Sequence, residues 1–224
     1  MLEDLRICIY YQSPMLAEKG VWDKEAWDRV GFGMLRPDDL SAVPTWFDVI
    51  IEVAPRLKTL AFSQGHYRSS HQTLHQVEQL SQSVQFTQLR ELHLHWIHLT
   101  SGTLKSFLNT AKPTLRVFTL FAVSLDANED LPINDPITSM YWQRLWDFFR
   151  DELSLQRFSM GKITSDPNKY LIQGPDELTK PSENAEFDAE TAGTSFSEWI
   201  DSLTLVLING YHHLYDREWI YQGM

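Results

Sequence analysis

The chain has 224 residues, of which 43% are hydrophobic and 12% aromatic, enough to bury a core in one domain or two small ones. A formal net charge of −11 disfavours a general role in binding nucleic acid phosphates, which requires clustered Lys and Arg. The single cysteine, Cys8, excludes an intrachain disulfide, and the sequence contains neither a signal-peptide pattern nor the roughly 20 apolar residues of a membrane span. We therefore expect a cytoplasmic or nuclear protein with no nucleic acid and no membrane among its partners.

A recurring pattern, Leu-x-x-apolar-x-apolar, predicts the strands of the protein. Its five copies begin at Leu2, Leu57, Leu89, Leu115 and Leu155. In each copy the leucine is followed by an apolar residue three positions later and by a second apolar residue two positions after that. This spacing indicates a short strand entered from a turn. The starts at Leu57, Leu89 and Leu115 are separated by 32 and 26 residues, near the roughly 20–29 residues of a leucine-rich unit. The two longer gaps predict insertions at residues 12–37 and 126–141.

Helices are expected between these strands. Apolar residues recur at helical spacing in residues 101–108 and 142–149, and residues 44–51 form a similar stretch. Pro55 and Pro113 stand where a helix should stop, just before the next strand motif. The order helix, turn and strand predicts an α/β fold, a leucine-rich-repeat solenoid over residues 1–164. Its strands would form one curved parallel sheet with the helices on the convex side.

The composition changes after this repeating region. Residues 165–195 are rich in Asp, Glu, Asn, Pro, Thr and Gly, which favours a mobile acidic linker or loop. Residues 194–198 then resemble a helix N-cap followed by an acidic first turn. Residues 196–224 are therefore expected to form a C-terminal helical cap, with Trp199, Leu203, Val206 and Leu207 on the side that covers the last repeat.

One block of the chain resembles a known family. Residues 89–108 and 113–120 combine a strand, a helix that ends in a Pro-Thr-Leu step, and another strand, as do the leucine-rich repeats of fungal F-box-type proteins. The resemblance covers roughly residues 40–164, and the sequence has no F-box-like segment ahead of the motif at Leu2. The family implies the substrate-recognition part of an SCF-type ubiquitin ligase, which binds a protein target on its concave face and a Skp1-like adaptor.

The candidate binding residues lie on the expected strands. Side chains alternate between the two faces of a strand, so residues between the buried leucines should point into the hollow of the solenoid. We expect partner-binding roles for Glu91, His93, His95, Thr119, Phe121, Arg157 and Ser159. Phe121 is the anchor candidate, because an exposed aromatic residue often dominates a protein interface. The alternative is that Phe121 packs against the inserted residues 126–141.

The sequence contains no recognisable catalytic or metal-binding constellation. His93 and His95 share a face, but nothing nearby supplies the further ligands that zinc needs, so we expect no metal and no cofactor. The same pair is the basis of an alternative, an enzyme of unrecognised type that uses His93 and His95 as acid–base residues. A third alternative is a non-functional repeat fragment. The favoured interpretation is a protein–protein interaction module that is not an enzyme.

Overall fold

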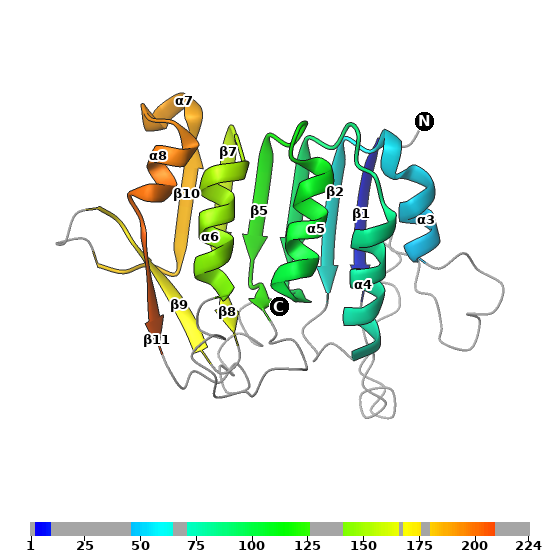
Figure 1. Cartoon of the computed structure of the whole chain (residues 1–224), viewed down its shortest axis with the longest axis horizontal. Coiled ribbons are helices and arrows are strands. Elements are labelled where there is room, and N and C mark those ends of the chain that lie inside the picture. The colour runs from blue at the N-terminus through cyan, green and yellow to red at the C-terminus, as the bar shows by residue number, and fades with distance from the viewer. Residues whose placement is uncertain are drawn as a thin grey trace, which may run out of the picture.

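A computed structural model describes residues 3–9, 46–64, 71–125, 141–165, 168–175 and 180–208. They form a mixed α/β structure with two sheets of mostly parallel strands and no closed barrel (Figure 1). The expected insertion at residues 12–37, residues 126–140 of the second insertion, and residues 209–224 of the expected cap lie outside the described residues. No helix in the described ranges has both the length and the apolar character to cross a bilayer.

The larger sheet has six strands in the order β1-β2-β3-β5-β7-β10. The first five are parallel to one another, and β10 is antiparallel to β7. Their bounds are β1 Asp4–Ile9, β2 Thr59–Gln64, β3 Glu91–His95, β5 Val117–Phe121, β7 Arg157–Gly161 and β10 Asn184–Asp188. The five parallel strands coincide with the five sequence motifs, so the predicted strands are confirmed.

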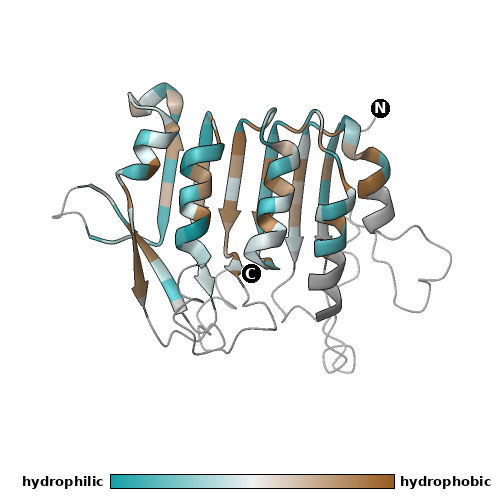
Figure 2. Cartoon of the chain, viewed as in Figure 1, coloured by the Kyte–Doolittle hydropathy of each residue, from teal (hydrophilic) through white to brown (hydrophobic). Residues whose placement is uncertain are grey.

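The second sheet lies at the carboxyl ends of the parallel strands and has the order β11-β9-β8-β6-β4. The short strands β4, β6 and β8 are parallel, and β9 and β11 continue the sheet in antiparallel pairs. The bounds are β4 His98–Leu99, β6 Ser124–Leu125, β8 Thr164–Ser165, β9 Asn168–Gln173 and β11 Thr204–Ile208. Figure 2 shows β11 as a largely hydrophobic strand.

The helices α3 to α6 cover one face of the larger sheet, and α8 lies beside α6 in front of β10 (Figure 1). The bounds are α3 Trp46–Val53, the 3₁₀ helix η2 Ala54–Arg56, α4 His71–Ser83, α5 Ser101–Ala111, α6 Tyr141–Glu152, α7 Ala189–Ala192 and α8 Phe196–Asp201. Helices were predicted near α3, α5 and α6, whereas α4 was not predicted. Its sequence is rich in Gln, Ser and His and carries few apolar residues.

The same connection follows three of the parallel strands. The first residue after β3, β5 and β7 has a positive φ, at Trp96 (54°), Ala122 (53°) and Lys162 (53°). This left-handed backbone is uncommon for residues other than glycine. It turns the chain so that the next residue, Ile97, Val123 or Ile163, is buried and the short strand of the second sheet begins. The recurrence shows that these residues belong to one repeated structural unit.

Hydrogen bonds at the start of the strands repeat in the same way. The carbonyl oxygen of Arg90 accepts hydrogen bonds from the backbone N–H groups of Arg116 (2.8 Å) and Val117 (2.9 Å). The carbonyls of Lys58 and Arg116 make equivalent pairs of bonds with the following unit. Buried backbone groups must be paired, and here each unit satisfies those of its neighbour. The units are therefore held in register across the sheet.

The core lies between the larger sheet and its helices. Register aligns one inward residue from each strand, including Leu60, Leu92, Phe118, Phe158 and Phe187, and all five are at most 3% exposed. Figure 2 shows that the strands and helices alternate hydrophobic and hydrophilic residues. Hydrophobic side chains of α4, α5 and α6 complete the core above the sheet. Burial of this apolar surface is the main force that holds the repeated units together.

The expected mobile linker at residues 165–195 is wrong over its described part. β9 and β10 both fall inside it. In β10, Ala185 and Phe187 face the core, whereas Asn184, Glu186 and Asp188 point to the other side. The polar residues that suggested disorder are thus the outward half of an edge strand, where charge is favoured.

The C-terminal segment is helical only at its start. The expected cap begins with α8, and Phe196 and Ile200 of this helix are buried. The helix ends at Asp201, and the chain continues as β11 rather than as the predicted helix. The run Thr204–Ile208 consists of β-branched and leucine residues, which favour a strand, and it pairs with β9. The spacing of apolar residues within the segment does not indicate this pairing, because β9 lies much earlier in the chain.

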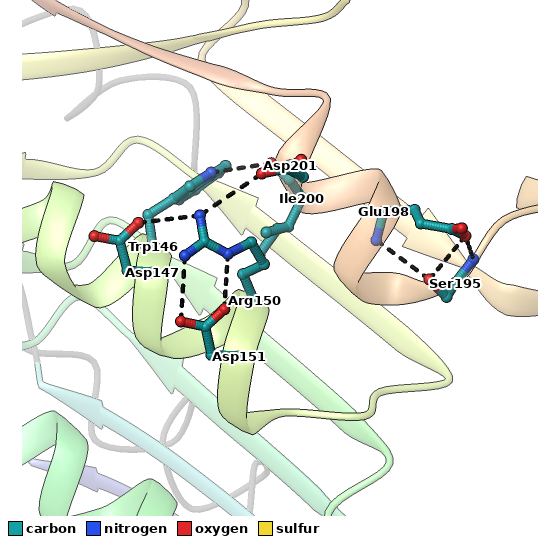
Figure 3. Close-up of polar contacts among 8 residues, drawn as sticks. All are labelled: Trp146, Asp147, Arg150, Asp151, Ser195, Glu198, Ile200 and Asp201. Atoms are coloured by element: carbon teal, nitrogen blue, oxygen red, sulfur yellow. Dashed lines mark hydrogen bonds and ion pairs between the residues drawn. The ribbon is translucent and has the colours of Figure 1, made fainter.

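Polar contacts hold α8 against α6 (Figure 3). The indole N–H of Trp146 donates to the carbonyl oxygen of Ile200 at 3.1 Å, and Arg150 Nη1 lies 3.6 Å from a carboxylate oxygen of Asp201. At the start of α8, Ser195 and Glu198 form a capping box, in which each side chain accepts a hydrogen bond from the backbone N–H of the other residue. These contacts fix α8 over the aromatic core formed around Phe158.

Candidate functional site

The seven candidate residues all lie on one side of the larger sheet. This side, named here the strand face, is opposite to α3–α6 and points away from the viewer in Figure 1. Its outward residues align across β2, β3, β5, β7 and β10 in three rows: Thr59, Glu91, Val117, Arg157 and Asp188; Ala61, His93, Thr119, Ser159 and Glu186; and Ser63, His95, Phe121, Gly161 and Asn184. The structure therefore brings the predicted residues together on three neighbouring strands.

His93 joins two of these strands. Its Nδ1 lies 3.0 Å from Thr119 Oγ1, so one of the two atoms donates a hydrogen bond to the other according to the tautomer. Its Nε2 lies 3.7 Å from Glu91 Oε2, at ion-pair distance when the imidazole is protonated. The contacts orient the ring and leave it partly exposed on the strand face.

Phe121 is surrounded by cationic and aromatic groups. Its ring centroid lies 6.2 Å from that of His95 and 5.9 Å from that of Trp96, which meets it edge to face. The Lys162 ammonium lies 5.2 Å from the Phe121 centroid, at cation–π distance. Because Trp96 and Lys162 both occupy the left-handed position after their strands, the repeated connection itself directs them to Phe121. Phe121 remains half-buried.

Gly161 creates a gap next to Phe121 that a side chain from β10 occupies. A Cβ at residue 161 would overlap with Oδ1 of Asn184 and would lie 3.0 Å from Cδ2 of Phe121. Asn184 is exposed, and its side-chain amide makes no hydrogen bond within the described structure. The absence of a side chain at Gly161 thus places an unpaired amide beside the aromatic ring.

The charge state of His95 depends on its burial. Partial burial lowers the pKa of His95 below the ordinary histidine value, and the nearby His93 lowers this pKa further. The ring centroids of His93 and His95 are 6.4 Å apart. His95 is therefore neutral at neutral pH, and its ring lies tilted beside that of Phe121.

The strand face carries charges of both signs. Asp188 and Arg157 are register partners, and the Asp188 carboxylate also accepts a hydrogen bond from the Glu190 N–H at 2.9 Å. Glu186 is exposed, lies opposite the uncharged Ser159, and makes no ion pair with any described residue. Arg157 is also exposed. The face therefore offers hydrogen-bonding and ionic groups beside an aromatic centre.

Two observations in the described part of the chain bear on metal and small-molecule binding. Among residues in the described ranges, no group of three or more His, Cys, Asp or Glu side chains is placed to hold a metal ion. An apolar cavity of about 10 Å³ lies under α4 and α5, lined by residues that include Leu60, Leu80 and Phe107. That volume is about the smallest that holds one water molecule, and the lining is apolar.

Four further residues belong to the site. Asn184 and Glu186 were placed in a linker, and only the antiparallel pairing of β10 with β7 brings them to the strand face. Trp96 and Lys162 follow strands at equivalent positions of the repeat, one residue after His95 and Gly161. That equivalence was a signal in the sequence, because the motifs align these positions, but the left-handed backbone that turns them toward Phe121 was not predicted.

Comparisons with known proteins do not assign this chain to a family. No family model matches it, and neither a curated protein nor a solved structure matches it. The F-box-type resemblance over residues 40–164 therefore stays an expectation from the sequence.

Proposed function

We propose that the chain is a leucine-rich-repeat solenoid whose strand face binds another protein. The observation that carries the proposal is Phe121, a half-buried aromatic residue surrounded by His95, Trp96 and Lys162 on the face of the sheet away from the helices. Repeat proteins present side chains on such a face in a fixed array. Aromatic residues with a polar surround are the usual centre of a protein interface.

A protein partner fits this surface better than the other ligand classes. The mixture of Glu91, Arg157 and Glu186 with Phe121 lacks the clustered positive charge that phosphate backbones need. The described cavity is too small for an organic ligand. The proposal assigns the strand face to binding a protein and names no catalytic residue, cofactor or metal.

The narrower form of the proposal is the substrate-recognition part of an SCF-type ubiquitin ligase. It is supported by the resemblance of residues 89–120 to fungal F-box-type repeats. In that form the strand face holds the target, and a Skp1-like adaptor binds elsewhere. The two forms differ in one observable, which is the presence of the adaptor in complexes isolated with the chain.

The test is affinity capture from native cell extract, followed by mass spectrometry. The variant Phe121→Asp, Arg157→Glu changes the strand face. The matched control Phe148→Asp, Arg144→Glu makes the same replacements on α6, where Phe148 is half-buried and Arg144 is exposed. Circular dichroism and a thermal transition show whether each variant is folded.

Partners that are lost with the strand-face variant and kept with the α6 variant support the proposal. Recovery of an adaptor with both variants, together with loss of the target only from the first, supports the ligase form. A target recovered without an adaptor indicates an independent binding module. Equal recovery of every partner with the folded strand-face variant would refute a role for this face.

A further inference from the structure

The strand face is asymmetric between β5 and β10, and this asymmetry points to a particular kind of ligand. An apolar ring, a free amide and a carboxylate follow one another across these strands, at Phe121, Asn184 and Glu186. We propose that this part of the face binds an extended protein segment that places a large apolar side chain on Phe121 and a Lys or Arg side chain at Glu186. The inference rests on the proposed function, and it specifies the partner's chemistry.

The apolar end of the site is Phe121. The neutral His95 ring and the edge of Trp96 flank it, so an aliphatic or aromatic side chain that covers Phe121 contacts carbon on several sides. Burial of such a side chain supplies the non-directional part of the affinity. The Lys162 ammonium at 5.2 Å from the ring centroid disfavours a second cation at this end.

The amide of Asn184 supplies the directional part. A carboxamide carries one acceptor and two donors, which is the complement of a main-chain peptide group with its own N–H and C=O. Gly161 allows Asn184 to lie beside Phe121, since a Cβ at residue 161 would lie 3.3 Å from Cγ of Asn184 and would overlap with its Oδ1. An extended segment leaves its peptide groups unpaired and so can use this amide.

The basic side chain is assigned by charge complementarity. Glu186 is exposed and has no ion-pair partner among the residues that the structure describes, whereas the carboxylate of Asp188 already caps the Glu190 N–H and faces Arg157 in register. Glu186 is therefore the carboxylate on β10 that a partner's cation can pair with.

Register sets the spacing between the two anchors. Glu186 lies two strands from Phe121 and two residues along the strand, because Phe121 is paired with Gly161, Gly161 with Asn184, and Glu186 with Ser159. With strands about 4.8 Å apart and about 3.3 Å per residue, the separation of the two Cα atoms is about 12 Å. An extended segment covers that distance in about three to four residues. The expected motif is a large apolar residue three or four positions from Lys or Arg.

The experiment is selection of linear peptides, displayed on phage, against the complete chain and its variants. The wild type is compared with Glu186→Arg, and Glu52→Arg is the matched control because Glu52 is an exposed carboxylate on α3. Selected peptides from the wild type are expected to share the spacing above. Peptides selected on Glu186→Arg should carry Asp or Glu at the position where the wild-type peptides carry Lys or Arg. Glu186→Arg should bind the wild-type peptides roughly tenfold or more weakly, whereas Glu52→Arg should bind them with unchanged affinity.

Two further variants test the amide. Asn184→Ala and Gly161→Ala should each weaken the same peptides several-fold, and the double variant should weaken them no more than one of the two does, since both remove the same contact. Peptides that depend on Phe121 but bind Glu186→Arg and Asn184→Ala as tightly as the wild type would overturn this inference and leave the proposed function standing. Enriched peptides that bind a folded Phe121→Asp variant unchanged would overturn both, and a selection without enrichment would overturn the inference.

Discussion

Phe118 and Phe121 lie three residues apart in β5, on opposite faces of the sheet, and they should respond very differently to replacement by alanine. Phe118 is fully buried, and its ring centroid lies 5.8 Å from the centroids of both Phe149 and Phe158. Phe121 is half-buried and contacts the smaller group of His95, Trp96 and Lys162. The two variants remove the same atoms from the same strand.

The expected losses of stability follow from this difference. Replacement of a buried Phe by Ala costs about 3–5 kcal/mol, and the two lost ring pairs place Phe118→Ala near the upper end of that range. Full burial of a Phe side chain contributes about 1.5–3 kcal/mol, and Phe121 is partly exposed, so its burial and its ring contacts with His95 and Trp96 give about 2 kcal/mol for Phe121→Ala. At about 2–4 °C per kcal/mol for a chain of this size, the melting temperature should fall by roughly 10–20 °C for Phe118→Ala and roughly 4–8 °C for Phe121→Ala.

Urea unfolding followed by tryptophan fluorescence measures the free energies, and binding of a captured partner measures function. We expect Phe121→Ala to lose the partner while it stays folded. We expect Phe118→Ala to lose much of its stability and to bind only as far as it is folded. A loss of 4 kcal/mol or more for Phe121→Ala would refute the reasoning, because Phe121 would then be a core residue, as expected if residues 126–141 covered it.

Four further substitutions test other features of the structure. Burial and His93 lower the pKa of His95, so the neutral ring stabilises the fold above the ordinary histidine pKa, and this stability is lost as the pH falls through the lowered value. Replacement of His95 by Gln should flatten the dependence of urea midpoints on pH between about 7 and 5, and an unchanged slope would contradict it. Ser195→Ala should destabilise the protein by about 1 kcal/mol in urea unfolding, since it removes the hydrogen bond to the Glu198 N–H. In the wild type, the backbone N–H and the hydroxyl of Ser195 donate hydrogen bonds to the Glu198 carboxylate and lower its pKa. The stability that this carboxylate contributes should be lost as the pH falls through the lowered pKa. Gly193→Ala should cost about 1–2 kcal/mol, because φ is +68° and no atom lies within 4 Å of the added Cβ, so the cost is that of the backbone alone. Gly102→Ala, in α5 with only an ordinary 3.7 Å contact, should instead raise the melting temperature.

The sequence predicts the parallel part of the fold well because its signal is local. Leu92 and Leu94, or Phe118 and Leu120, lie two residues apart inside a single short strand, and each pair follows a leucine at a fixed distance. The same alternation predicts that His93, His95 and Phe121 share a face, and the register of β3 and β5 places His95 beside Phe121. Local periodicity therefore yields both the strands and the centre of the candidate site.

Other parts depend on contacts between residues distant in the chain. β10 contains only two inward apolar residues, and its position is set by antiparallel pairing with β7. Asn184 and Glu186 consequently carry no local sign that they lie next to Phe121 and Ser159. The helix α4 was missed for a related reason, since few of its described residues are buried, namely Val77, Leu80 and Ser81. Packing against α5 and the sheet stabilises it more than its own propensity does.

The effect of an added repeat on the candidate site depends on where in the larger sheet it is inserted. The strands β3 and β5 pair in parallel, so the strand in a copy of residues 89–114 inserted before Leu115 would pair in parallel with a neighbour on each side. The same copy placed after β7 would separate β7 from β10, and it would increase the distance between Phe121 and Glu186 because these residues would lie on either side of it. Lengthening within the parallel region would move His93 about 4.8 Å per added strand from β10, while Phe121 and Glu186 would keep their separation. Diversification by duplication could thus enlarge the surface without disturbing its recognition centre.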